Sequence, residues 1–361
     1  MVKSICFKIE TITPMFLSGA DQEKVELRAP SIKGLIRYWW RALMADPNID
    51  RLKKNESEIS GSSDEKTGGG SRFSIRVISD PHFETATTSF PNRNNIHRIM
   101  VHSNRQNRDF SINILEYLAY GPFDPSTKKI RPYIASKSKF DLIIAFTDVS
   151  IINDVLKTIY VFSLFGGIGS RSRNGFGSFR ILNLQDVFQD IKNDFSIENC
   201  YTHENIQKIV NQSADVCSYS SFSSGTRLFR AEQRDTWDEA LAEIGKIYRS
   251  IRIGEARVNG ESFENKHTFL KRQYIGAPLD PYKENFYSLL DRHSKPYFIK
   301  VAKENNKYRA YMLYLPSLYA EGLDEDRRGN TINNHDNLNI RFKEVCLDFN
   351  RFLESRLEAI L

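Results

Sequence analysis

The stretch that most constrains the fold of this chain is the glycine-rich run at residues 166–177. It reads Gly-Gly-Ile-Gly-Ser-Arg-Ser-Arg-Asn-Gly-Phe-Gly, with five glycines and two arginines in twelve residues. Glycine permits positive φ angles and close backbone approach, and successive amides of such a turn can bind an anion. The run follows an apolar helical segment and precedes a strand segment, whereas Rossmann and Walker loops follow a strand and open a helix. The run therefore predicts an anion-binding turn rather than a nucleotide-binding loop of the Rossmann or Walker type. The alternative interpretation is a glycine-rich turn that tight packing requires.

The segments around this run predict the order strand, helix, strand, strand, helix, strand over residues 1–184. Alternating apolar residues indicate strands at 4–12 and 72–79, and a buried strand is indicated at 140–147. Helical spacing from Ser31, the expected N-cap, to Leu43 indicates the first helix. A second helix is expected at 152–165 and a fourth strand at 176–184. This is the order of the ferredoxin-like split βαβ fold.

Two insertions interrupt this order. Residues 53–71 mix glycine, serine and charged residues, which predicts a flexible loop. Residues 80–133 lack clear periodicity and are rich in Asn, Arg, Pro and Tyr, which predicts a long functional insertion.

The second half resembles a decayed copy of the first. A strand is expected at 219–229, an amphipathic helix at 237–252, a hairpin at 295–301 and 307–315 across Asn305-Asn306, and a helix at 342–361. No final strand is evident, and residues 185–218 are expected to form a helical link. We therefore expect an α+β protein of two tandem ferredoxin-like domains, 1–184 and 185–361, the second degenerate.

Charge is unevenly distributed along the chain. The net charge is +6, of which residues 1–184 contribute +8 and residues 185–361 contribute −2. A basic half beside a nearly neutral half is typical of a protein that binds a polyanion, most often nucleic acid. Solubility alone is the alternative explanation.

The first helix carries a basic stripe opposite its apolar face. Lys33, Arg37 and Arg41 are spaced four residues apart, Trp40 flanks them, and Arg28 precedes the helix. Cations that follow phosphates beside an aromatic ring suit single-stranded nucleic acid. An ordinary solvated face is the competing interpretation.

Two further sets of residues complete the predicted RNA-binding surface. In the insertion, cations alternate with amides, histidines and aromatic residues, as expected of a surface that contacts RNA. The insertion contributes Arg93, Arg98, Arg105, Lys128, Lys129 and Arg131. The glycine-rich run contributes Gly166, Gly167, Gly169, Arg171, Arg173 and Gly175.

Several classes of protein are disfavoured by the composition. The four cysteines contain no CxxC pair, which argues against a zinc cluster or a disulfide framework. The first ten residues alternate like a strand and lack the apolar core of a signal peptide, so a cytoplasmic protein without membrane contact is expected. We expect no metal, no cofactor and no small-molecule substrate.

Two motifs resemble the RAMP superfamily of CRISPR proteins. The first comprises Thr13–Gly19 and Arg28–Leu43. It includes Ile-Lys-Gly-Leu-Ile-Arg-Tyr-Trp-Trp-Arg, which is most similar to the family of first subunits of Cmr (type III-B) effector complexes. The second is the glycine-rich run, and a weaker match is Arg-His-Ser-Lys-Pro at 292–296. The resemblance implies two ferredoxin-like domains and an RNA-binding role near the 3′ region of the guide RNA and the target RNA, with other Cmr subunits as partners.

The resemblance also implies that this subunit is not the nuclease that cuts the target. Some relatives process guide RNA, so a metal-independent endonuclease that uses His97 and His102 as acid and base is an alternative. A structural cap that contacts only neighbouring proteins is a third possibility. We expect a non-catalytic RNA-binding subunit.

Overall fold

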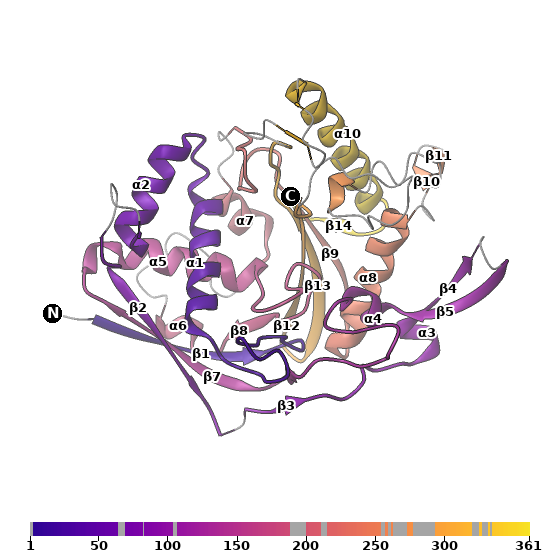
Figure 1. Ribbon diagram of the computed structural model, residues 1–361, viewed down its shortest axis with the longest axis horizontal. Helices are drawn as coiled ribbons and strands as arrows, with labels where there is room; N and C mark the ends of the chain where they lie inside the picture. The colour runs from indigo at the N-terminus through magenta and orange to yellow at the C-terminus, as the bar shows by residue number, and fades with distance from the viewer. Residues whose placement is uncertain are drawn as a thin grey trace.

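The computed structural model shows two halves that lie side by side, each built on a four-stranded antiparallel sheet (Figure 1). It describes residues 3–63, 69–81, 83–103, 107–187, 200–210, 215–253, 257–258, 261–262, 273–276, 293–319, 325–326, 331–332 and 334–361. Within this part of the chain, no helix is both long and apolar enough to cross a bilayer.

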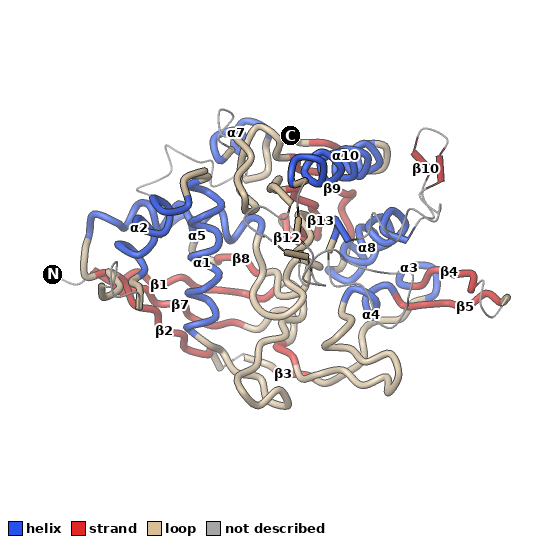
Figure 2. Tube along the Cα trace, turned by 45° about the horizontal axis from the view of Figure 1, so that its top comes forward, coloured by secondary structure: helices blue, strands red, loops and turns tan. Residues whose placement is uncertain are grey.

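The first sheet has the strand order β2-β7-β1-β8. Its strands are β1 (Lys3–Thr11), β2 (Phe73–Ser79), β7 (Lys139–Phe146) and β8 (Phe179–Ile181). Helices α1 (Ala29–Met44) and α5 (Ile152–Phe165) cover one face of this sheet (Figure 2). The predicted element order is therefore confirmed, although β8 is shorter than expected.

Two local expectations for the first half are wrong. Helix α1 begins at Ala29 with Arg28 as its N-cap, so Ser31 does not cap it. Residues 49–60, expected to be partly loop, form α2 (Ile49–Ser60), because the Asn48 side chain caps the first turn and Leu52 packs inward. The glycine and serine content of the following residues hid the helix.

The insertion at 80–133 contains more regular structure than its sequence indicates. Short strands β3 (Thr85–Ala86) and β6 (Tyr133–Ile134) pair, and β4 (Arg98–Ser103) forms a hairpin with β5 (Arg108–Asn113). Two short helices, α3 (Asn94–His97) and α4 (Ile114–Leu118), pack against α8 (Trp237–Ile253) of the second half. The insertion therefore joins the two halves.

The second sheet has the order β12-β13-β9-β14, which repeats the topology of the first. Strand β9 (Arg227–Arg234) is followed by α8 (Trp237–Ile253), β12 (Tyr297–Glu304), β13 (Lys307–Tyr314), α10 (His335–Glu354) and β14 (Glu358–Ala359). The expected helix to residue 361 is therefore wrong, since α10 ends at Glu354 and β14 supplies the final strand that the sequence did not reveal.

The remaining elements are short. The link contains α6 (Leu184–Val187) and α7 (His203–Ile209), and 3-10 turns lie at η1 (Val149–Ile151) and η3 (Gln273–Ile275). Strands β10 (Arg257–Val258) and β11 (Glu261–Ser262) pair with each other. The expected strand at 219–229 lies later in the chain, as β9.

Both faces of the second sheet are buried, each against a different set of helices. Phe298, Tyr311 and Leu313 belong to the core that includes α1 and α5. Tyr297 and Met312, which point the opposite way, belong to the core that includes α8 and α10. Because alternate residues of a strand face opposite sides, a continuous apolar run in β12 and β13 serves both cores.

The buried side chain of Lys300 ties β12 to the first half. Its Nζ atom donates to the carbonyls of Gly166, at 2.8 Å, and Phe179, at 2.9 Å, and lies 4.5 Å from the centre of the Phe179 ring. Burial lowers the pKa of Lys300 well below its ordinary value. These bonds place the start of the glycine-rich run directly against the second sheet.

We predict that Lys300→Met lowers the free energy of unfolding by about 1–3 kcal/mol, because it leaves buried carbonyls without their donor. Lys307→Met is the matched control, since Lys307 is exposed on the same hairpin and pairs with the exposed Asp235. Urea denaturation of both variants measures the difference. Equal unfolding midpoints for the two variants would contradict a stabilising role for the Lys300 hydrogen bonds.

Candidate nucleic-acid interface

A cavity of 740 Å³ lies where the glycine-rich run, the insertion and the second half meet. Four cationic side chains line it: Arg171, Arg173, Arg252 and Lys295. The rest of the wall consists of Tyr117, Tyr120, Ser170, Ser172, Asn174, Tyr248, Ile275, Gly276, His293 and Ser294. This described wall contains cations and aromatic rings but no carboxylate.

Arg173 fastens the run to the second half. Its guanidinium donates to the Lys295 carbonyl at 2.6 Å and lies over the ring of Phe298, 4.4 Å from the ring centre. The guanidinium also lies near the ring of Tyr38 of α1, at 5.4 Å. The Ile299 amide donates to the Arg173 carbonyl at 3.1 Å. Arg173 therefore has a structural role as well as a place in the wall.

The glycines of the run shape the loop from inside the protein. Gly175 has φ +89°, and a Cβ there would lie 2.5 Å from Cδ1 of Leu241. Gly166 and Gly167 are also buried, and at Gly169, with φ +93°, a Cβ would lie 2.3 Å from the Phe16 carbonyl oxygen. The expectation that these four glycines contact RNA directly is therefore corrected for the three buried ones, Gly166, Gly167 and Gly175. Tight packing inside the protein explains why glycine is present at these positions.

Arg171 remains accessible at the turn of the loop. It is exposed, has φ +60°, and its guanidinium lies against Gly121 of the insertion. Partial burial and the nearby Arg252 lower the pKa of Arg171. A bound anion would relieve the repulsion between these two guanidiniums.

Lys295 lies at the buried end of the cluster. The residue is 8% exposed, and its Nζ atom lies 4.1 Å from the centre of the Tyr248 ring. Among the described residues this Nζ atom has no hydrogen-bond partner. Burial, together with Arg252, Arg173 and Arg171, lowers the pKa of Lys295 well below its ordinary value. The charged form of Lys295 is therefore costly on its own, and an anion bound in the cavity would stabilise it.

A second hollow of 520 Å³ continues from the same tyrosine. Tyr120 lines both hollows, and Lys129 and Arg131 line the second. Its wall also includes Asp124, whose pKa is lowered to about 2 by hydrogen bonds from the Ser126 and Thr127 side chains and the Ser126 amide. Lys128 is exposed in this loop with φ +58°. The insertion cations at 128–131 therefore lie beside the main cavity.

The basic stripe of α1 faces elsewhere. Arg37 and Arg41 both donate to the same carboxylate oxygen of Glu56 on α2, each at 2.6 Å. Lys33 lies over Phe73, 5.0 Å from the ring centre, and burial lowers its pKa. None of these three cations lines the cavity. The expectation that they converge with the loop arginines on one groove is not what the geometry shows, because α2 lies against the stripe.

The indole of Trp40 is buried, with the residue 5% exposed. It therefore offers no stacking surface to a base in this structure, which corrects that expectation. Arg28 lies at the start of α1, where its guanidinium approaches Glu26 at 3.6 Å.

The remaining predicted residues of the insertion are held by the protein itself. Arg93 pairs with Asp238 at 3.0 Å and Glu239 at 2.9 Å, and Arg98 donates to the Ser111 hydroxyl at 2.7 Å. Arg105 lies outside the described residues. These contacts place the first two cations on α8 and the β4–β5 hairpin rather than in the cavity.

His97 does not have the surroundings of a catalytic base. It is fully buried, its Nδ1 accepts from the Arg93 amide at 2.9 Å, and its Nε2 lies 2.8 Å from Asp238. Since Nδ1 accepts a hydrogen bond, the proton of the neutral ring is on Nε2, and burial lowers the pKa of His97. The side chain of His102, its expected partner in catalysis, lies outside the described residues.

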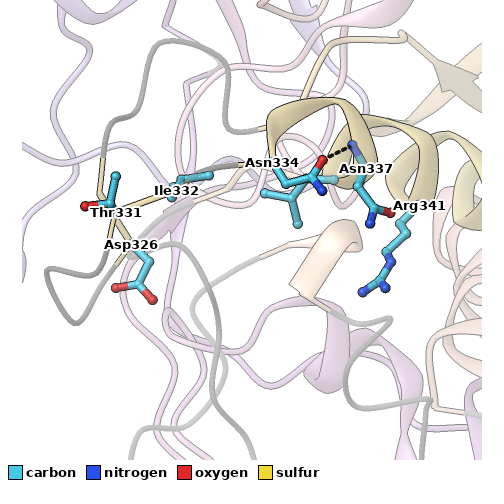
Figure 3. A pocket seen from close by; sticks show the side chains of 7 residues that line it. Asp326, Thr331, Ile332, Asn334, Asn337 and Arg341 are labelled. Carbon is cyan, nitrogen blue, oxygen red and sulfur yellow. Dashed lines mark hydrogen bonds between the residues drawn. The ribbon is translucent and has the colours of Figure 1, made fainter.

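A smaller hollow of 260 Å³ lies at the start of α10 (Figure 3). Asp326 and Arg341 line it, and the Asn334 side chain accepts from the Asn337 amide at 3.0 Å. No group of three or more potential metal ligands occurs among the described residues here or elsewhere. With one charge of each sign, this hollow lacks the electrostatic bias of the main cavity.

Three residues of the main cavity were missed at the level of sequence. Tyr248 and Arg252 lie four residues apart on α8, a helix judged only by its apolar face. Lys295 is the residue that weakened the match of 292–296 to the superfamily segment. The available signal was the position of a lysine inside a motif, together with an aromatic–arginine pair at helical spacing.

The comparisons with known proteins agree with this architecture. The family model of the RAMP superfamily matches residues 8–180, which confirms the resemblance of the sequence to that superfamily. The chain is similar to the CRISPR system Cmr subunit Cmr1-2 of Pyrococcus furiosus, with 28% identity over 193 residues, 50% of this chain and 96% of that protein. Cmr1-1 of the same organism is 29% identical over 51% of this chain and 50% of its own length.

Solved structures extend the similarity of the fold to the whole chain. The crystal structure of Cmr1 from Pyrococcus furiosus matches with a TM-score of 0.56 and 18% identity, covering 99% of this chain and 98% of that one. A chain of the type III-B Cmr-beta complex bound to cognate target RNA matches with a TM-score of 0.52 and 12% identity, covering 98% and 99%. The resemblance of the sequence to the first Cmr subunit is thus confirmed.

We predict that His293 makes stability fall on acidification. Burial and Arg173 lower the pKa of His293 to about 4, and its ring packs on Tyr319 with centroids 4.6 Å apart. Because the unfolded imidazole has a pKa of about 6.5, the unfolded state takes up a proton first as the pH falls. The stabilising contribution is therefore complete above pH 6.5 and is lost between about 6.5 and 4.

In His293→Gln, the free energy of unfolding should depend less steeply on pH across this window. Denaturation at a series of pH values measures the slope, with values above the window as the reference. Curves that run parallel for the two proteins would contradict the prediction.

Proposed function

We propose that this protein is a non-catalytic RNA-binding subunit of a type III-B CRISPR ribonucleoprotein, and that the cavity between its halves holds a sugar–phosphate strand. The observation that carries the proposal is the wall of four cations without a described carboxylate, beside exposed tyrosine surface. Cations that contact phosphates and rings that stack on bases are the two components of single-strand binding. We further infer that both halves are ferredoxin-like domains, since both have the strand order 2-3-1-4.

The similar proteins support a place in such a complex. The relatives are described as subunits of the Cmr system, and a matching chain belongs to a complex bound to cognate target RNA. By this analogy the partners are other Cmr subunits, the guide RNA near its 3′ region, and the target RNA. The absence of catalysis is part of the proposal, supported by the burial of His97.

The adjoining hollow gives the proposed strand a direction to follow. Tyr120 is 61% exposed and lies between the main cavity and the hollow lined by Lys129 and Arg131. A strand that leaves Arg171 can therefore pass the ring of Tyr120 and continue along these two cations, on the side of the hollow away from the carboxylates of Glu23 and Asp124 that also line it. The stripe on α1 is a separate surface, which remains a predicted RNA contact.

We predict that Arg171→Ala combined with Arg252→Ala weakens binding of single-stranded RNA by roughly 1–3 kcal/mol. For each phosphate that the variant no longer neutralises, the slope of log K against log salt should become shallower by about 1. Fluorescence anisotropy over a salt series measures both quantities. Arg51→Ala is the control, because Arg51 is an exposed arginine of α2 paired with Asp46.

The Arg37→Ala, Arg41→Ala variant tests the α1 surface in the same assay. Since both guanidiniums share the carboxylate of Glu56, we expect this double variant to lose less affinity for RNA than the double variant of Arg171 and Arg252. An isolated chain that does not bind RNA even at low salt would overturn the proposed function in favour of a structural cap. Cleavage of guide-repeat RNA in EDTA, lost in His97→Gln, would favour the processing enzyme.

A further inference from the structure

The buried end of the main cavity contains a lysine side chain that an RNA strand lying across the cavity mouth would not contact. Lys295 is 8% exposed and its Nζ atom has no hydrogen-bond partner among the described residues, although it belongs to the cavity wall. Only a group that enters the cavity can reach this atom. A ligand that contacts this atom must therefore carry its negative charge on a terminal group that extends into the cavity.

The charges around Lys295 match a group with more than one negative charge. Arg171 and Arg252 are close enough to lower the pKa of Lys295, and Arg173 joins them from the loop. Arg173 donates one N–H group to the Lys295 carbonyl and Arg252 donates one to the Tyr117 hydroxyl at 3.3 Å, and each guanidinium has further N–H groups that a ligand could accept from. A phosphomonoester carries a charge of about −1.5 to −2 at neutral pH and three terminal oxygens. An internal phosphodiester carries a single charge.

Geometry also separates the two kinds of phosphate. An internal phosphodiester is joined to a nucleotide on each side, so it reaches a recessed cation only if the strand folds back on itself. A terminal phosphate can enter first, with its nucleotide behind it. The ring of Tyr120 is exposed near the cavity and is available for the base of that nucleotide, whereas the ring of Tyr248 is covered by Lys295.

We propose that the cavity recognises the terminal phosphomonoester of an RNA strand, with Lys295 and Arg252 at the phosphate and Tyr120 at the terminal base. This inference rests on the proposed function, because it names the part of the RNA that the same site selects. On this proposal the protein recognises the end of an RNA strand in addition to binding single-stranded RNA.

The test compares one short RNA sequence with three kinds of end: a 5′-phosphate, a 3′-phosphate, and hydroxyls at both ends. The full chain is titrated against each RNA, carrying an internal fluorophore, at one salt concentration. We expect one phosphorylated end to raise affinity about tenfold over the hydroxyl-ended RNA, as a charge-assisted contact with a recessed cluster requires. The phosphorylated RNA whose affinity increases identifies which end of the strand is bound.

Lys295→Gln should abolish this gain, so that the three RNAs bind this variant with affinities within about twofold of one another. Lys307→Gln, an exposed lysine of the neighbouring hairpin, should retain the gain. Arg252→Gln provides a second variant in the same cluster, which decides the outcome if thermal unfolding shows that Lys295→Gln does not fold. Retention of the full gain in a folded cluster variant would overturn the assignment.

A nucleoside monophosphate, added at constant ionic strength, separates a strand end from a free nucleotide. It should displace the phosphate-ended RNA only at concentrations far above those of the RNA itself. Equal affinity for all three RNAs would overturn the end-recognition proposal and leave the proposed function standing. Failure to bind any of the three would overturn the proposed function itself.

Discussion

The structure depends on the insertion of one glycine-rich loop between two sheets of the same topology. At one end of the loop, the Lys300 ammonium binds the Gly166 and Phe179 carbonyls, and at its middle the Arg173 guanidinium binds the Lys295 carbonyl. These are hydrogen bonds from buried or half-buried cations to main-chain oxygen, which a change of side chain on the other partner cannot remove. The relative position of the two halves, and hence the cavity between them, follows from them.

The same contacts explain how a cluster of like charges is tolerated. Arg173 spreads its charge over the rings of Phe298 and Tyr38, and Lys295 lies over Tyr248. Ring faces stabilise cations without neutralising them, so the positive potential of the cavity is preserved. By contrast, the arginines of α1 share the carboxylate of Glu56, and Arg93 lies between Asp238 and Glu239. The protein thus neutralises some of its cations with carboxylates and supports Arg173 and Lys295 with aromatic rings, together with a main-chain carbonyl that accepts from Arg173.

Sequence patterns predicted regular elements well where one periodicity applied. The alternation in β1 and β7, the helical spacing of α5 and the Asn305-Asn306 turn each correspond to an observed element. They failed at α2, where capping by Asn48 outweighed a composition typical of loops, and at β14, which is two residues long and exists because it pairs with β9. For the candidate site, Arg171 and Arg173 were predicted, whereas Lys295 and Arg252 were not.

The sequence by itself determined the superfamily motifs, the order of strands and helices in the first half, and the location of excess positive charge. Only the tertiary structure decided which of those charges remain available to a ligand. The physical reason is that a cation becomes available or neutralised according to the residues that the fold brings beside it. Glu56 lies fifteen residues from Arg41 and Asp238 lies 145 from Arg93, so neither pairing can be read from the pattern around the arginine alone.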